Sequence, residues 1–121
     1  MKKTSILVVE DERAIAKALE LKLTHEGYEV VTAADGEAAL ELLKKQSYKL
    51  MLLDLVMPKM DGFQVLEALR AQRSSVPVMV LSNLSQEDDE KKARALGAKD
   101  FFIKSNSPLA DIVVRVKKLL T

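Results

Sequence analysis

The sequence contains no cysteine and only one histidine, His25, among its 121 residues. The lack of cysteine excludes disulfides, thiolate chemistry and cysteine-ligated metals, and a single histidine cannot build a zinc site. Glycine is scarce as well, and the four glycines form no GxGxxG motif, so no dinucleotide-type phosphate loop is predicted. Thiol, zinc and nucleotide-loop chemistry are therefore excluded from the start.

An excess of either charge and a long apolar run are also missing. The 19 Lys and Arg residues nearly cancel the 18 Asp and Glu residues, which gives no reason to expect nucleic-acid or membrane-surface binding. The longest apolar run is too short to span a bilayer, and the N-terminal MKKTSILVVEDE reaches acids before a signal-peptide core could form. We expect a cytoplasmic protein without membrane insertion or direct nucleic-acid contact.

Two kinds of segment alternate along the chain. Five segments are short and mainly apolar: 5–9, 29–33, 50–53, 78–81 and 101–103. Several of them are apolar on consecutive residues, as in parallel strands buried on both faces. Five others show apolar residues at helical spacing: 12–26, 36–46, 61–72, 86–96 and 108–120. The alternation predicts one α/β domain over 1–121, a doubly wound five-stranded parallel sheet without an output domain. We adopt the strand order 2-1-3-4-5, which is common for five strands lacking a second mononucleotide-binding half.

Four of the five predicted strands end on polar residues, and these ends meet at one edge of such a sheet. The residues are Glu10 and Asp11, Asp54, Ser82, and Lys104. Three crowded carboxylates repel one another unless a cation joins them. Hard oxygen ligands without histidine or cysteine favour Mg²⁺, or the similar Mn²⁺. The sequence thus predicts a divalent-metal site held by Glu10, Asp11 and Asp54.

A carboxylate beside such a metal can attack a phosphoryl group, because the metal offsets the phosphoryl charge. Lys104 supplies a point charge and Ser82 a small hydroxyl, and both suit contacts with phosphoryl oxygens. The pattern therefore predicts that Asp54 is a phosphoryl-accepting aspartate.

Four stretches carry a resemblance to a known family: VVEDE at 8–12, LLDLVMPKMDG at 52–62, VLSNLS at 80–85 and GAKDFFIK at 97–104. Over essentially its whole length the sequence resembles the response-regulator receiver domains of two-component signalling systems, which have a CheY-like, flavodoxin-like fold. The resemblance implies that Asp54 takes a phosphoryl group from a histidine kinase or a histidine phosphotransfer protein. It implies direct Mg²⁺ ligation by Asp11, Asp54 and the Val56 backbone carbonyl, with Glu10 acting through water.

The resemblance also implies how a phosphoryl signal is read. Ser82 and Lys104 would contact the phosphoryl oxygens, and Phe101 falls at the position of the family's switch aromatic. The implied role is a switch that signals to a downstream protein through the fourth helix, fifth strand and fifth helix, not a turnover enzyme on an external substrate. A phosphorylation-dependent dimer is one state open to such a switch. The candidates for contact with the downstream partner are the charged residues Lys91, Lys92, Arg94 and Lys117. The resemblance also implies a kinase-docking surface on the first helix, which includes Ile15 and Ala18.

The sequence departs from the family pattern at two positions beside the site. Ser105 follows Lys104 where the family has proline, so the family's cis peptide is not expected there, since a cis bond before a non-proline residue costs several kcal/mol. Asn83 replaces a small residue after Ser82 and could crowd phosphoryl access. Val56 and Leu84 offer no polar group to orient a hydrolytic water, which predicts slow self-dephosphorylation.

Three alternatives compete with the receiver hypothesis. A haloacid-dehalogenase-type phosphatase requires a second aspartate two residues after the nucleophile, where this chain has Val56. A flavodoxin-like FMN protein requires a phosphate loop after the first strand, where Glu10 and Asp11 would repel phosphate. A receiver-like binding module that works without phosphorylation stays open because of Asn83 and Ser105.

Overall fold

The computed structural model describes residues 3–83, 87–104 and 108–121, which form a five-stranded, all-parallel sheet in the order β2-β1-β3-β4-β5. The strands are β1 (Ser5–Val9), β2 (Glu29–Ala33), β3 (Leu50–Asp54), β4 (Val78–Ser82) and β5 (Asp100–Ile103). The predicted α/β class and the adopted strand order are both confirmed.

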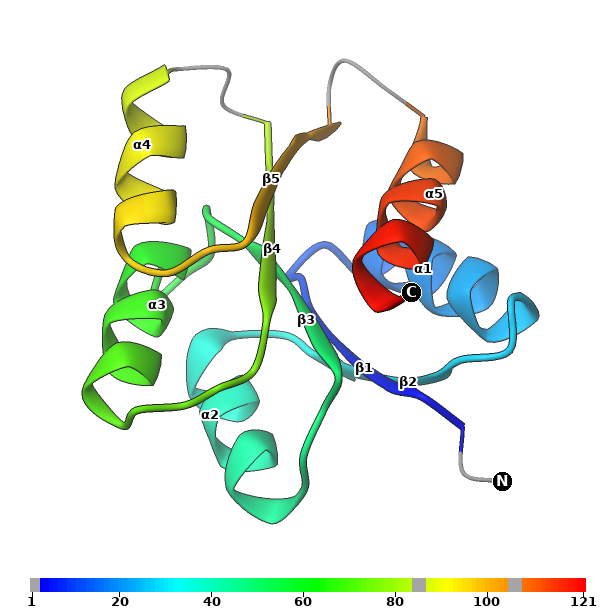
Figure 1. The fold of residues 1–121 in the computed structure, drawn as a ribbon, viewed down its shortest axis with the longest axis horizontal. Helices are drawn as coiled ribbons and strands as arrows, with labels where there is room; N and C mark the ends of the chain where they lie inside the picture. Colours follow the sequence, from blue (N-terminus) through cyan, green and yellow to red (C-terminus); the bar gives the residue numbers. More distant parts are fainter. Residues whose placement is uncertain (1–2, 84–86, 105–107) are drawn as a thin grey trace.

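Five helices cover the two faces of the sheet. They are α1 (Arg13–His25), α2 (Gly36–Lys45), α3 (Gly62–Ala71), α4 (Glu87–Ala95) and α5 (Leu109–Leu120), and each begins and ends within one residue of its predicted position. Figure 1 shows α1 and α5 on one face and α2, α3 and α4 on the other. Among the described residues, no helix has the length and apolar character that crossing a membrane requires.

Each central strand contributes to two separate apolar cores, which explains the apolar residues at consecutive positions. Leu7 and Val9 of β1 point into the core under α2, α3 and α4, whereas Ile6 and Val8 join the core under α1 and α5. Strand β3 alternates in the same way, and every one of its residues is buried. A strand sandwiched between two helical layers has no face on which a polar residue is tolerated until the strand ends.

The start of α3 is seated directly against the end of β3. Asp61 caps α3 through a reciprocal capping box with Gln64, a standard way to satisfy the first backbone N–H groups of a helix. A Cβ atom on Gly62 would lie only 2.7 Å from the Asp54 carbonyl oxygen and 2.7 Å from the Leu55 Cα atom. Only glycine permits this approach, which fixes the connector that follows Asp54.

Candidate functional site

The predicted site residues come together at the C-terminal edge of the sheet. Strand β1 pairs with β3, with Val9 opposite Leu53, so Glu10 and Asp11 emerge beside Asp54. One carboxylate oxygen from each of these three acids lies within 4.8 Å of the others. On the other side of β3, Ser82 of β4 lies opposite Ile103 of β5, which brings Lys104 to the same edge. The sequence-predicted cluster is therefore present as one group.

Most of this polar group is buried, which is unusual for charged side chains. Glu10 is 2% exposed, Asp54 4% and Ser82 0%. Buried polar groups are tolerated only when they are paired, and no buried side-chain nitrogen or oxygen lacks a partner within the described residues. The pairing inside the cluster therefore determines what it can do.

Lys104 is the cation of the cluster. Its Nζ atom lies 2.7 Å from Glu10 Oε1 and 3.7 Å from Asp54 Oδ1. The second oxygen of Glu10 accepts the Glu12 N–H at 3.3 Å, and Asp54 Oδ1 accepts the Val56 N–H at 3.4 Å. Lys104 thus binds Glu10 more closely than Asp54. The sequence placed these residues at one edge but gave no sign of this preference.

These surroundings shift the proton affinity of two groups. Burial, followed by the neighbouring Glu10 carboxylate, raises the pKa of Asp54 to about 7, although Lys104 and the Val56 N–H oppose the shift. Burial is the largest single influence on Lys104 and lowers its pKa, but the contacts with Glu10 and Asp54 together outweigh it, so the pKa of Lys104 is raised. At neutral pH Lys104 is charged, and Asp54 is poised between its two protonation states.

The donor set suits a hard divalent cation. All three clustered side chains offer carboxylate oxygens, and Mg²⁺ or Mn²⁺ prefers such ligands. Val56 contacts Asp54 through its N–H group, while its side chain is 59% exposed beside the site. The residues present therefore fit the implied metal.

Phe101 and Ser82 are both interior residues. Phe101 is 6% exposed and packs in the core under α2, α3 and α4, so in this conformation it is a core side chain, and its switch role stays a prediction. Asn83 is exposed. Leu84 and Ser105, on which two sequence predictions depend, lie outside the described residues, as does the Lys104–Ser105 peptide bond.

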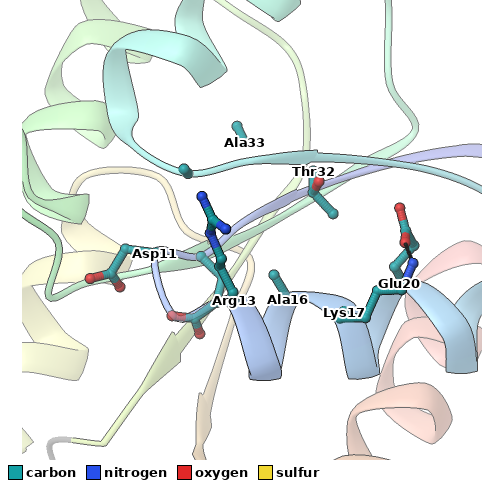
Figure 2. A pocket seen from close by; sticks show the side chains of 9 residues that line it. Asp11, Arg13, Ala16, Lys17, Glu20, Thr32 and Ala33 are labelled. Atoms are coloured by element: carbon teal, nitrogen blue, oxygen red, sulfur yellow. Dashed lines mark hydrogen bonds and ion pairs between the residues drawn. The ribbon is translucent and has the colours of Figure 1, made fainter.

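A hollow adjoins the acidic cluster on the side of β2. It is lined by residues of the β1–α1 connection, the first turns of α1 and the end of β2. In Figure 2, Arg13, Ala16 and Lys17 line one side of it and Thr32 and Ala33 the other. Glu10 and Asp11 border the hollow, but Asp54 and Lys104 do not. Asp54 therefore lies on the other side of β1.

The predicted partner-contact cations are engaged within the molecule. Lys92 lies over the Phe63 ring, 4.3 Å from its centroid. Arg94 pairs with Glu90 and Asp100. Lys117 pairs with Glu26, the residue directly after α1, away from α4. Of the expected kinase-docking positions, Ile15 and Ala18 are partly buried on α1.

Comparison with known proteins agrees with this geometry. The family model described as the response regulator receiver domain matches residues 6–117. A probable transcriptional regulator, ycf27 of Porphyridium aerugineum, is 42% identical over 120 residues, which cover 99% of this chain and 49% of the relative. The alkaline phosphatase synthesis transcriptional regulatory protein PhoP of Bacillus subtilis is 39% identical over 115 residues, covering 95% and 48%. The chain spans about half the length of these relatives.

Solved structures show the same fold. A response regulator receiver domain from Francisella superposes with a TM-score of 0.90 at 29% identity, covering 97% of this chain and 96% of that one. The response regulator TrrA of Thermotoga maritima, solved in complex with Mg²⁺-BeF, superposes with a TM-score of 0.84 at 33% identity, covering 97% and 99%. Sequence, fold and the acid-lysine cluster at the strand ends agree, and the chain belongs to the response regulator receiver domain family.

Proposed function

We propose that this receiver accepts a phosphoryl group on Asp54 from a histidine kinase or a histidine phosphotransfer protein and thereby controls a partner protein. The observation that supports this most is the juxtaposition of three carboxylate groups with one buried lysine at the edge of the sheet. A carboxylate that merely caps a turn needs neither a second and third acid nor a buried ammonium group.

Glu10, Asp11 and Asp54, with the Val56 backbone carbonyl, are the groups that would hold Mg²⁺ or Mn²⁺. The bound metal would offset the charge of the incoming phosphoryl group. This assignment is supported by the all-oxygen donor set, and by TrrA, which was solved with Mg²⁺-BeF.

The transfer exchanges one bond for another. A carboxylate oxygen of Asp54 forms a bond to phosphorus while the bond from phosphorus to the donor histidine nitrogen breaks, and that nitrogen keeps the electron pair. The reaction needs the ionised carboxylate, and Lys104 favours this form from 3.7 Å. Lys104 and the Ser82 hydroxyl would then contact the phosphoryl oxygens, since an ammonium group and a hydroxyl are suitable donors to them.

The signal would be read on the face formed by α4, β5 and α5. Ser82 ends β4, directly before the β4–α4 connection, and Lys104 follows β5. Movement of either side chain toward a phosphoryl group would therefore act on the connections that lead into α4 and α5. A downstream protein, or a second copy of this chain, would recognise the altered face.

The test is phosphorylation by acetyl phosphate with Mg²⁺, measured by intact mass. We expect the wild-type protein to gain the mass of one phosphoryl group and the Asp54→Asn variant to gain none. Asp61→Asn is the matched control, because Asp61 caps α3 outside the cluster, and it should be labelled like the wild type. Labelling that survives in Asp54→Asn would refute Asp54 as acceptor, and no labelling of a folded wild type would favour the phosphorylation-independent module.

A further inference from the structure

A second hollow lies at the N-terminal edge of the sheet, opposite the acidic cluster. It is lined by the segment that leads into β1, the α2–β3 connection and the residues before β4. Its volume of about 580 Å³ falls within the roughly 300–1,000 Å³ of small-molecule sites. Strand β1 has five residues, which span roughly 17 Å, so this hollow is separate from the site at Asp54.

Tyr48 distinguishes this hollow from ordinary protein surface. The residue is 6% exposed, and its ring packs in the core under α2, α3 and α4. In the part of the chain that the structure describes, the Tyr48 hydroxyl forms no hydrogen bond, and yet no buried side-chain oxygen there lacks a partner. The hydroxyl is therefore the end of the ring that reaches solvent, at the place where Tyr48 lines the hollow. A largely buried tyrosine usually has a partner for its hydroxyl, so this one is an available donor.

The groups around the Tyr48 hydroxyl are also donors. Lys3 and Lys49 contribute ammonium groups to the lining, and Ser47 and Ser75 contribute hydroxyls. Neither lysine forms an ion pair with any described residue. Ammonium and hydroxyl groups together suit the oxygens of a phosphate group.

One carboxylate near the hollow opposes an anion. Glu29 lies at the start of β2, where Ser5 Oγ is 3.5 Å from its Oε1 atom, but Glu29 is not among the lining residues. Burial, followed by the Glu29 carboxylate, raises the pKa of Tyr48, so the hydroxyl keeps its proton and remains a donor at neutral pH. Two lysines against one glutamate leave this edge with a positive balance.

Backbone hydrogen bonds hold the walls of the hollow in place. The Lys49 N–H donates to the Ser5 carbonyl at 2.9 Å, and the Met51 N–H donates to the Pro77 carbonyl at 2.9 Å. These bonds join the starts of β1, β3 and β4. The lining residues are thus positioned before a ligand arrives, which lowers the entropic cost of binding.

We propose that this hollow binds a small phosphorylated molecule, whose phosphate oxygens accept hydrogen bonds from the Tyr48 hydroxyl and the Lys49 ammonium group. Lys3 adds a second positive charge, and Ser47 and Ser75 would bind hydroxyl groups of a phosphate ester. The site shares no residue with the acidic cluster, so it does not depend on phosphorylation of Asp54. Its occupation would stabilise the folded receiver.

An amide NMR titration of the ¹⁵N-labelled protein in EDTA locates the site. The probes are inorganic phosphate and glycerol 3-phosphate, with potassium chloride at equal ionic strength as the control. We expect saturable shifts at residues 3–5, 47–49 and 74–76 with the phosphate probes and none with chloride. Tighter binding of glycerol 3-phosphate would identify a phosphate ester as the ligand, and equal binding would identify the phosphate group alone. Shifts confined to Ser82 and Lys104, or a response equal to that of chloride, would overturn the proposal.

Three substitutions test the assigned contacts, and melting curves establish that each variant is folded. Tyr48→Phe keeps the packed ring and removes only the hydroxyl, so the phosphate affinity should fall about tenfold, the size of one hydrogen bond to a charged group. Lys49→Met should weaken binding by a similar factor. Glu29→Gln should strengthen binding about threefold, because it removes the nearby repulsive charge.

Two matched controls separate the hydroxyl contact from a general charge effect. Tyr28→Phe removes the hydroxyl of a tyrosine that packs against the other core, under α1 and α5. Lys45→Met removes the charge of an exposed lysine at the end of α2 that does not line the hollow. Each should change the phosphate affinity less than twofold. Wild-type affinity in Tyr48→Phe would overturn the proposal even if Lys49→Met binds more weakly, since attraction by charge alone does not need the hydroxyl.

Discussion

Burial and the Glu10 carboxylate both disfavour a negative charge on Asp54, and together they raise its pKa from an ordinary 3.8 to about 7. An unfolded chain releases this proton near pH 4, whereas the folded protein retains it until about pH 7. Between these values the folded state binds the additional proton, so stability falls as pH rises and is constant above pH 7. Asp54 is therefore a destabilising residue at neutral pH.

Replacing Asp54 with asparagine should remove this penalty. In EDTA at pH 8, we expect Asp54→Asn to raise the free energy of unfolding by about 2 kcal/mol, and the gain should vanish near pH 4. Urea unfolding at several pH values measures it. Asp88→Asn, at an exposed position of α4, serves as control and should show no comparable pH-dependent gain. A gain for Asp54→Asn that does not depend on pH would contradict the assigned cause.

We expect Val56 to govern the lifetime of a phosphoryl group on Asp54. Val56 is 59% exposed next to Asp54, and its side chain has no polar atom to orient water. We expect Val56→Asn to shorten the lifetime of the phosphorylated protein about tenfold, a modest effect for one positioned polar group. Loss of phosphoryl mass over time measures it. Val114→Asn, at another exposed valine on α5, should leave the lifetime unchanged, and rapid decay of the wild type within seconds would contradict the role given to Val56.

At the scale of elements, the β3–α3 junction leaves no room for a side chain at position 62. The Cβ atom of an alanine at position 62 would overlap backbone atoms of Asp54 and Leu55 at 2.7 Å. Because backbone cannot move aside cheaply, Gly62→Ala should lower the free energy of unfolding by about 2–3 kcal/mol.

A matched comparison for Gly62 is Gly97→Ala. Gly97 has a φ of +110° but no atom within 4 Å of an added Cβ, so its cost is backbone strain of about 1–2 kcal/mol. The two variants also differ at the site: Gly62→Ala should slow labelling of Asp54 in the folded protein, whereas Gly97→Ala should not. If Gly62→Ala has the same free energy of unfolding as the wild type, the β3–α3 junction has room for a Cβ atom at position 62, and the prediction is wrong.

Helix α4 is anchored chiefly through its C-terminal half. Arg94 contacts Asp100 at 3.5 Å and the Lys99 carbonyl at 3.2 Å, and Arg115 of α5 reaches Asp100 at 2.7 Å. Ala93 is the one α4 side chain in the apolar core among those that the structure describes. Asp100 therefore links α4, β5 and α5, the three elements assigned to the readout.

Weakening this link should loosen the readout face. Asp100→Asn keeps an acceptor for the Phe101 N–H but removes the charge shared by two arginines. We expect a loss of about 1 kcal/mol, the upper end for partly exposed ion pairs, and faster amide hydrogen exchange in α4 and α5. Glu41→Gln, which breaks the exposed pair with Lys44, should change neither measurably. Unchanged exchange in Asp100→Asn would show that Asp100 does not join these elements.

For the whole molecule, the sequence was sufficient to predict the architecture. Consecutive apolar residues in several of the five short segments indicated strands buried on both faces, which holds for β3 and β4 but not for β2, where Glu29 and Thr32 are exposed. The alternation with helices left few topologies, and the strand order was adopted from the commoner of them. The polar residue at the end of four strands predicted the cluster, because parallel strands bring their C-terminal ends to one edge. The metal and phosphoryl roles of these residues remain predictions.

Other features could not be read from the sequence because they depend on distances between side chains. Nothing in the chain order shows that Lys104 binds Glu10 more closely than Asp54, or that Asp100 pairs with two arginines. The glycine at position 62, directly after the capping Asp61, is compatible with close packing of the helix start against the end of β3. The sequence alone does not show that the two backbones approach each other there. Likewise, the aromatic residue at position 101 fits both a core and a switch, and only packing identifies it as core in this conformation.

If Asp54 accepts the phosphoryl group, the chemistry at Asp54 changes the α4–β5–α5 face. The most direct test is an amide NMR titration of the ¹⁵N-labelled protein with beryllofluoride and Mg²⁺, with Asp54→Asn as control. We expect shifts at Asp54, Ser82 and Lys104 that continue into α4, β5 and α5, with none of them in Asp54→Asn. Shifts confined to the strand ends, or equal shifts in Asp54→Asn, would contradict it.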